Sequence, residues 1–232
     1  MKKIKESHNL LKFVLINIIL LILSFPQLAK TDEIISEYIV STSGIKIGKF
    51  SWSININKNN YETKIFLKNS GLFSTFYQFE GEYVSKGKVY ENKFKSNYYK
   101  QFWKTNKKTK TIEIFFEEKL IELIQKPEET EEARINFNKL IDYYDPITSF
   151  INILRGNDLV KTVDGRRVYT MKKIILGNKS LISIEIINYK NIWADHKRND
   201  LNKIEFLLNE NEMFPEKINI YFKERIFKLQ SI

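Results

Sequence analysis

The chain contains no cysteine among its 232 residues and only two histidines, His8 and His196. The lack of cysteine excludes disulfide bonds, and it also excludes a lipid anchor attached to a cysteine. No Cys or His pair has the spacing of a metal site, so we expect neither a metal nor a cofactor. Catalysis by a histidine would depend on His196, whose neighbour Asp195 cannot orient it because adjacent side chains diverge. We interpret His196 as part of an exposed polar loop.

Long apolar runs are equally scarce. The one such run, at residues 13–25, is shorter than the about 20 apolar residues that a membrane span needs. Three lysines among the first five residues precede it and the small residue Ala29 follows it, which is the layout of a secretory signal. We therefore predict a signal peptide at residues 1–29 and a single exported, periplasmic domain at residues 30–232. An uncleaved signal that anchors the protein in the inner membrane is the alternative.

The positive charge of the chain is not concentrated on any element. The formal net charge is +10 at pH 7, and leaving out residues 1–29, which carry +3, reduces it to +7. A nucleic-acid-binding protein gathers its basic residues on one face or element. Here the dense group is confined to four lysines between residues 104 and 110, at a predicted hairpin tip. We expect no nucleic-acid partner, whereas weak attraction to anionic lipid headgroups fits the charge.

Apolar and polar residues alternate through most of the remaining chain, which predicts strands with one buried face. The clearest examples are residues 182–186, 204–208 and 218–222. Turn residues separate these strands by short connections, which favour antiparallel pairing of neighbours.

The alternation changes phase near Gly48. Ile45 and Ile47 occupy odd positions, whereas Phe50 and Trp52 occupy even ones. One extra residue at a glycine is typical of a β-bulge, and a bulge bends and twists the sheet. We therefore predict a curved sheet.

One short helix is predicted after Asp145. Asp145 is a favourable N-cap, Pro146 suits the first helical position, and Gly156 ends the helix. Apolar residues between them share one face: Ile147, Phe150, Ile151 and Leu154. Such a stripe needs an apolar partner, and a curved sheet offers one. The predicted fold class is mainly β, a strongly curved or twisted antiparallel sheet, half-barrel or sandwich-like, with one short helix packed on its open face.

Four segments carry a family resemblance. They are the hairpin at 38–50 (YIVSTSGIKIGKF), the step at 69–72 (NSGL), the helix start at 145–150 (DPITSF) and the strand start at 164–169 (DGRRVY). In this order they resemble the landmarks of the bacterial exported family called domain of unknown function 3108. The similarity extends over residues 36–225. The residues that carry its structural motifs are Gly44, Gly48, Gly71, Asp145, Pro146, Asp164 and Gly165.

This resemblance implies a β-rich fold of twisted antiparallel strands, akin to the half-barrel of periplasmic lipoprotein carriers. The family has no established activity, so the resemblance leaves the function open.

Two groups of residues carry candidate binding chemistry. In a structural interpretation, Asp145 caps the helix while Arg166 and Arg167 pair with a carboxylate. In a functional one, the two guanidinium groups, beside Tyr143 and Tyr144, bind an anion. A second group of aromatic residues forms either core or the lining of a pocket for an acyl chain or a glycan. The candidate ligand-binding residues are Phe73, Phe76, Tyr77, Tyr99, Trp103, Tyr144, Arg166 and Arg167.

The sequence leaves three functions open. The leading one is an exported, non-catalytic protein that binds a lipid or another hydrophobic small molecule in maintenance of the cell envelope. The alternatives are a hydrolase of envelope glycans that uses Asp142, Asp145 and Glu80, and a scaffold that binds an envelope protein at a sheet edge. An apolar cavity of a few hundred Å³ favours the first, and two convergent carboxylates in a cleft favour the second. The oligomeric state stays open.

Overall fold

The computed structural model describes residues 33–71, 74–75, 78–117, 120–177, 180–193, 200–209 and 212–232. The predicted signal peptide and the loop with His196 lie outside these residues. The elements in chain order are β1 (Glu33–Thr42), β2 (Ile45–Asn57), β3 (Asn60–Asn69), β4 (Phe79–Tyr90), β5 (Lys93–Thr105), β6 (Thr109–Phe116), β7 (Ile121–Lys126), the 3-10 turn η1 (Phe137–Lys139), β8 (Tyr143–Tyr144), α3 (Pro146–Leu154), β9 (Leu159–Val163), β10 (Arg167–Ile175), β11 (Leu181–Asn191), β12 (Leu201–Leu207), β13 (Lys217–Phe222) and β14 (Arg225–Ser231).

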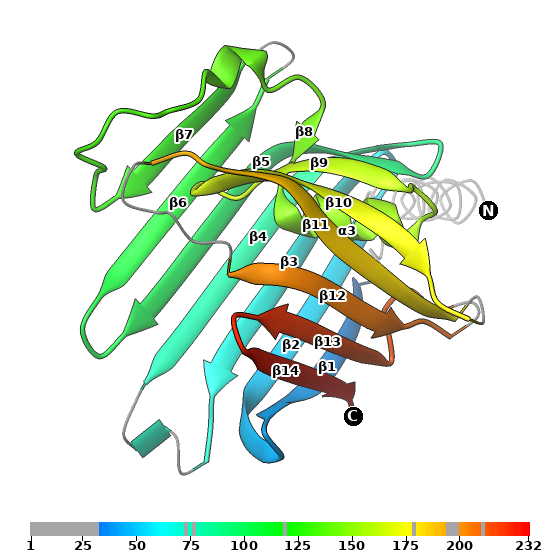
Figure 1. Cartoon of the computed structure of the whole chain (residues 1–232). Coiled ribbons are helices and arrows are strands. Elements are labelled where there is room, and N and C mark those ends of the chain that lie inside the picture. The colour runs from blue at the N-terminus through cyan, green and yellow to red at the C-terminus, as the bar shows by residue number, and fades with distance from the viewer. Residues whose placement is uncertain are drawn as a thin grey trace, which may run out of the picture. The chain divides into compact units, whose positions relative to one another are not determined.

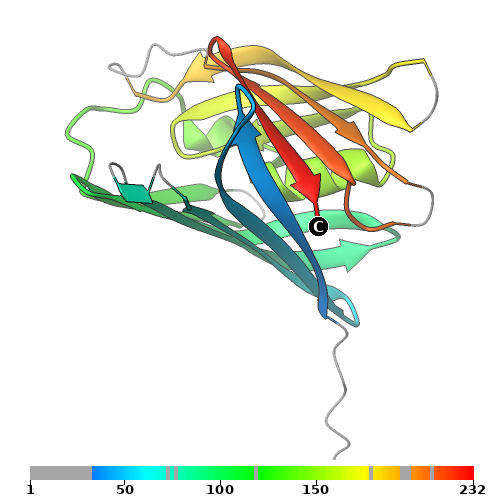
Figure 2. The same cartoon turned by 90° about the horizontal axis from the view of Figure 1, so that it is seen from below.

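All the strands belong to one 14-stranded sheet in the order β7-β6-β5-β4-β3-β2-β1-β14-β13-β12-β11-β10-β9-β8. Strands β1 to β7 form one meander and β9 to β14 a second, and the two meanders join where β1 pairs with β14. Pairing is antiparallel except between β8 and β9, which are parallel. The sheet curls so that β4 to β7 form one layer and β9 to β12 another, with α3 between them (Figures 1 and 2). This architecture confirms the predicted fold class.

The bulge predicted at Gly48 is confirmed. Val40 pairs with Gly48 and Ser41 with Lys46, so Ile47 is the extra residue on β2. Gly48 also lies against β3, where a Cβ on residue 48 would come within 2.6 Å of the carbonyl oxygen of Lys68. Only glycine allows this close approach of two backbones at the point where the sheet bends.

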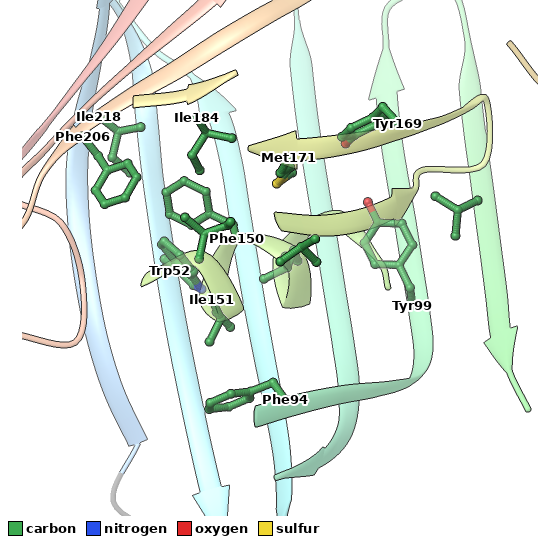
Figure 3. Close-up of a cluster of buried hydrophobic side chains, with 14 of the residues drawn as sticks. Trp52, Phe94, Tyr99, Phe150, Ile151, Tyr169, Met171, Ile184, Phe206 and Ile218 are labelled. Carbon is green, nitrogen blue, oxygen red and sulfur yellow. The ribbon is translucent and has the colours of Figure 1, made fainter. Parts of the chain in front are cut away.

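Aromatic side chains from distant strands meet around the helix in the centre of the core (Figure 3). The ring of Trp52 lies 5.6 Å from that of Phe150 and 4.8 Å from that of Phe214, measured between ring centroids. Phe150 in turn lies 5.2 Å from Phe206 on β12. The helix therefore binds β2 to β12 through a continuous aromatic contact.

The helix begins and ends where the sequence predicts, but it is buried on every side rather than on one stripe. Thr148, Ser149 and Asn152 on its polar face are buried along with its apolar residues. The reason is that both layers of the sheet contact it, so its polar side chains must find partners inside the protein. No helix in the described part of the chain is long and apolar enough to cross a membrane.

Candidate functional site

An apolar cavity of about 370 Å³ lies between the two layers of the sheet, beside the first turn of α3, and is partly open to solvent. Both layers contribute to its wall because the inward-facing positions of each meander point to the same space. Its lining residues are Phe50, Trp52, Ile65, Leu67, Tyr83, Tyr99, Gln101, Pro146, Ile147, Phe150, Asp164, Arg167, Tyr169, Met171, Leu201, Ile204, Ile218 and Ile220. Volume and lining are those of a small-molecule site, a mostly apolar hollow with a few polar groups.

The charged residues of the wall, Asp164 and Arg167, come from one tight turn between β9 and β10. Asp164 Oδ1 accepts hydrogen bonds from the backbone N–H groups of Arg166 (3.0 Å) and Arg167 (2.9 Å). Its other oxygen, Oδ2, lies 3.0 Å from Arg167 Nε, close enough for an ion pair but out of line for a hydrogen bond. Arg167 also donates to the hydroxyl of Tyr189 at 3.3 Å. Burial is the largest single influence and lowers the pKa of Arg167, but Asp164, Tyr189 and Tyr169 together outweigh it and raise the pKa, so the guanidinium stays charged.

Gly165, at the tip of this turn, holds the two layers of the sheet in contact. Its φ is +81°, and a Cβ there would come within 2.6 Å of the Cγ2 atom of Ile112 on β6. Its carbonyl accepts a hydrogen bond of 3.0 Å from the indole of Trp193. The second meander therefore touches the first at this turn, next to the charged residues of the cavity.

Asp145 is fully buried, and both of its oxygens are satisfied. Oδ1 accepts from the N–H groups of Ile147 (2.9 Å) and Thr148 (3.0 Å), which is the predicted N-cap. Oδ2 accepts from three hydroxyl groups, those of Ser85 on β4, Ser96 on β5 and Thr148. The hydroxyl of Tyr61 on β3 bonds to those of Ser85 and Thr148. Asp145 thus fastens the helix to three strands through hydroxyl groups, and its partners are not arginines.

The pKa of Asp145 is raised because it is buried, although the hydrogen bonds from Ser96, Thr148 and Ser85 favour its charged form and lower it. Asp145 does not line the cavity described above. The cluster is therefore a structural link between helix and sheet.

The structure places some of the candidate binding residues on the cavity and others away from it. Tyr99 and Arg167 line the cavity. Trp103 is half-buried farther along β5 and outside the lining, and Tyr144 lines a separate small cleft of about 70 Å³. Arg166 is half-buried on the turn and lies outside both linings. Phe73, Phe76 and Tyr77 lie outside the described residues. A binding role for these eight residues stays a prediction.

The three carboxylates of the hydrolase alternative do not meet in the cavity. Asp145 is sealed within its hydroxyl network. Asp142 is exposed at the small cleft, and Glu80 on β4 lies opposite Lys68 of β3 and Lys104 of β5 in the strand register. Among the described residues that line the large cavity, Asp164 is the single carboxylate. The described residues also hold no cluster of three metal-ligating side chains.

The sequence pattern did not identify most of the cavity wall as a binding surface. Phe50, Leu67, Ile204 and Ile220 stand at inward positions of their strands, which period-two alternation assigns to the core. The alternation gives the face of each side chain, but whether that face packs solid or leaves a space depends on the distance between the two layers.

The fold is similar to one of the solved structures, described as "Crystal Structure of Beta-barrel-like Protein of Domain of Unknown Function DUF1849 from Brucella abortus". The TM-score is 0.52 with 11% sequence identity, and the similarity covers 87% of this chain and 96% of that one. At this identity the likeness concerns the fold alone. No curated protein matches the chain. The profile of the family described as "Protein of unknown function (DUF3108)" matches residues 37–185, which confirms the family suspected from the four segments. The chain therefore belongs to the DUF3108 family.

Proposed function

We propose that this protein is a non-catalytic binding protein that holds an apolar ligand, such as the acyl chain of a lipid, in the cavity between the two layers of its sheet. The observation that carries the proposal is the cavity itself, with a volume of about 370 Å³ and a wall made almost entirely of apolar and aromatic side chains. This volume falls within the range of about 300–1,000 Å³ that is usual for small-molecule sites. A core without a ligand would normally pack solid.

Burial of an apolar tail supplies much of the free energy that such binding needs. Burial of a methylene group contributes about 0.8 kcal/mol, so a tail of about eight to ten carbons offers roughly 6–8 kcal/mol before ordering costs. Micromolar affinity corresponds to about 8 kcal/mol. Because the ordering costs are subtracted from this sum, burial of the tail alone gives an affinity weaker than micromolar, and further contacts in the cavity must supply the rest.

The carboxylate arrangement favours binding over hydrolysis. A glycosidase needs two carboxyl groups facing one bond from about 5–10 Å apart. Asp164 stands alone among the described lining residues, and its oxygens are engaged by two backbone N–H groups and by Arg167. The family of this chain and the solved structure with a similar fold are both domains of unknown function, so neither gives a reason to prefer an enzyme.

Export is part of the same proposal and rests on the basic start, the apolar run and Ala29 in the N-terminal segment. In the periplasm, a protein with an apolar cavity would meet lipids and their acyl chains, which fits a role in the cell envelope.

The test uses N-phenyl-1-naphthylamine, a neutral apolar dye that fluoresces in apolar surroundings. We expect saturable, roughly micromolar binding to the purified protein. Leu67→Trp fills the cavity from β3 and should weaken binding by about tenfold or more, because the ligand must then displace a large side chain. Phe66→Trp is the matched control, since Phe66 is the preceding residue of the same strand and is 40% exposed on the opposite face. Absence of saturable binding, or equal loss in both variants, would contradict the proposal.

A further inference from the structure

The wall of the cavity contains two buried tyrosine side chains whose hydroxyl groups make no hydrogen bond to any described residue. Tyr99 on β5 is 2% exposed and Tyr169 on β10 is 3% exposed, and both line the cavity. Among the described residues, neither hydroxyl makes a hydrogen bond, although Tyr61 and Tyr38, buried to a similar degree, do. Neither hydroxyl is sealed against packed atoms, so both border the open space. Because the cavity is partly open to solvent, both hydroxyls are free to bond to a water molecule or to a polar group of a ligand.

The two rings approach from opposite layers of the sheet. Figure 3 shows Tyr99 rising from β5 with its hydroxyl directed toward the layer that carries Tyr169. They lie at the charged end of the cavity, because Asp164 precedes Tyr169 by five residues and Arg167 precedes it by two. The charges of both act on the Tyr169 hydroxyl: Asp164 raises its pKa and Arg167 lowers it. Gln101, two residues after Tyr99 on the same face of β5, adds a side-chain amide to this part of the wall.

Both hydroxyls are donors. Burial raises the pKa of Tyr99 and of Tyr169 well above the ordinary value, so both are protonated at neutral pH. Arg167 only donates, and the amide of Gln101 donates as well as accepts, while the one carboxylate, Asp164, is already engaged by the backbone and by Arg167. This end of the cavity can therefore direct several donors at a ligand group that only accepts.

We propose that the hydroxyls of Tyr99 and Tyr169 bind the carbonyl or carboxyl oxygen at the head of an acyl chain whose tail fills the apolar part of the cavity. This inference rests on the proposed function and adds the chemical class of the ligand to it. A carbonyl or carboxyl oxygen accepts two hydrogen bonds, one from each layer of the sheet, and the neighbouring Arg167 suits a carboxylate. The oxygen belongs to a free fatty acid or to an acyl ester, since both present the same acceptor to the two phenols.

The experiment measures displacement of N-phenyl-1-naphthylamine by three ligands of equal chain length: decanoic acid, methyl decanoate and decane. We expect the acid, or the acid and the ester, to bind about tenfold or more tightly than decane, which has no acceptor. Preference for the acid alone identifies a free fatty acid as the source, and equal preference for acid and ester identifies the acyl carbonyl itself. Both results support the inference.

Tyr99→Phe with Tyr169→Phe removes only the two oxygens and keeps both rings in place. In this double variant the preference over decane should disappear while the affinity for decane is unchanged or improved. If the double variant does not fold, each single variant should lose roughly half of the preference on a logarithmic scale. Tyr98→Phe is the matched control, because Tyr98 is the neighbour of Tyr99 on the opposite face and donates to Glu113 outside the cavity.

The two proposals fail separately. Equal binding of acid, ester and decane to the wild-type protein, or a preference that survives in the double variant, overturns the assignment of the hydroxyls and leaves the apolar cavity as a binding site. Failure of the neutral dye and of all three ligands to bind overturns both.

Discussion

The two oxygens of Asp145 have different roles, and the difference decides what a substitution does. Oδ1 caps α3 by accepting hydrogen bonds from two backbone N–H groups, whereas Oδ2 accepts hydrogen bonds from three hydroxyl groups, on β4, β5 and the helix. If capping were its whole role, asparagine should replace Asp145 with little effect, since asparagine caps equally well. The structure changes this expectation, because an amide nitrogen in place of Oδ2 cannot accept from the hydroxyls.

We expect Asp145→Ala to lower the free energy of unfolding by about 3 kcal/mol or more, because it removes the cap and leaves three buried hydroxyls without their acceptor. Asp145→Asn should cost about 1–2 kcal/mol, since it keeps the cap and the hydroxyls must turn to accept. Urea unfolding followed by circular dichroism measures both. A silent Asp145→Asn would show that the hydroxyl contacts of Oδ2 contribute nothing to stability.

The raised pKa of Asp145 gives a pH dependence with a definite sign. A carboxyl with a raised pKa in the folded protein contributes stability that is complete below the unfolded value of about 4 and is lost as the pH rises through the folded value. Relative to Asp145→Asn, which does not titrate, the wild-type protein should therefore become less stable as the pH increases from about 4. Unfolding of the pair across this range isolates Asp145 from other carboxyls such as Glu205, whose pKa is lowered in spite of burial by hydrogen bonds from Lys203 and Tyr221. If the wild-type protein instead becomes more stable than Asp145→Asn as the pH rises, the pKa of Asp145 in the folded protein is depressed.

At the scale of elements, two glycines control how the meanders bend and meet. Gly48 permits β2 to approach β3 at the bulge, and Gly165 permits the β9–β10 turn to touch β6. Gly165 also has a positive φ, and its neighbour Ile112 belongs to the opposite layer.

Gly165→Ala should destabilise the protein by roughly 1–3 kcal/mol, because alanine is strained at this φ and its methyl group would collide with Ile112. It should also weaken binding of the neutral dye, since the turn carries the charged end of the cavity wall. Gly44→Ala is the matched control, with a φ of +80° but no atom within 4 Å of the added Cβ. Equal effects of the two substitutions would assign the cost to the backbone alone and argue against a role for the contact with Ile112.

At the scale of the whole molecule, one curled sheet gives both a core and a hollow. The helix fills the space between the layers near β2 and β12, where Trp52, Phe150 and Phe206 are in contact, and it leaves the space beside its first turn unfilled. The ends of the sheet, β7 and β8, are not paired with each other, so strand pairing joins the two layers at one side only. A ligand that bridges the layers should therefore stabilise the fold as it binds.

The proposed export makes a prediction for the whole chain. When the gene is expressed in a Gram-negative host, the mature N-terminus should fall between about residues 25 and 32, because the apolar run ends at residue 25 and the small residue Ala29 follows. Mass spectrometry of the protein from a periplasmic fraction checks this. Intact Met1 on a membrane-bound protein would favour the uncleaved anchor.

Much of this protein follows from local sequence pattern. Asp145, Pro146 and Gly156 set the helix boundaries, and the phase change at Gly48 locates the bulge, because capping, proline geometry and strand alternation act over a few neighbouring residues. Alternation also gives the inward face of each strand, and with it the class of the fold.

Only the tertiary structure decided which inward faces meet. Tyr99 and Tyr169 are 70 positions apart in sequence, and Ser85 and Ser96 reach Asp145 across 60 and 49 residues. Their encounter depends on the curl of the sheet and on the pairing of β1 with β14, which accumulate over many strands and leave no local signal. The cavity has the same origin. A side chain's position on a strand fixes the direction in which it points, whereas the separation of the two layers fixes whether it meets another side chain or an empty space.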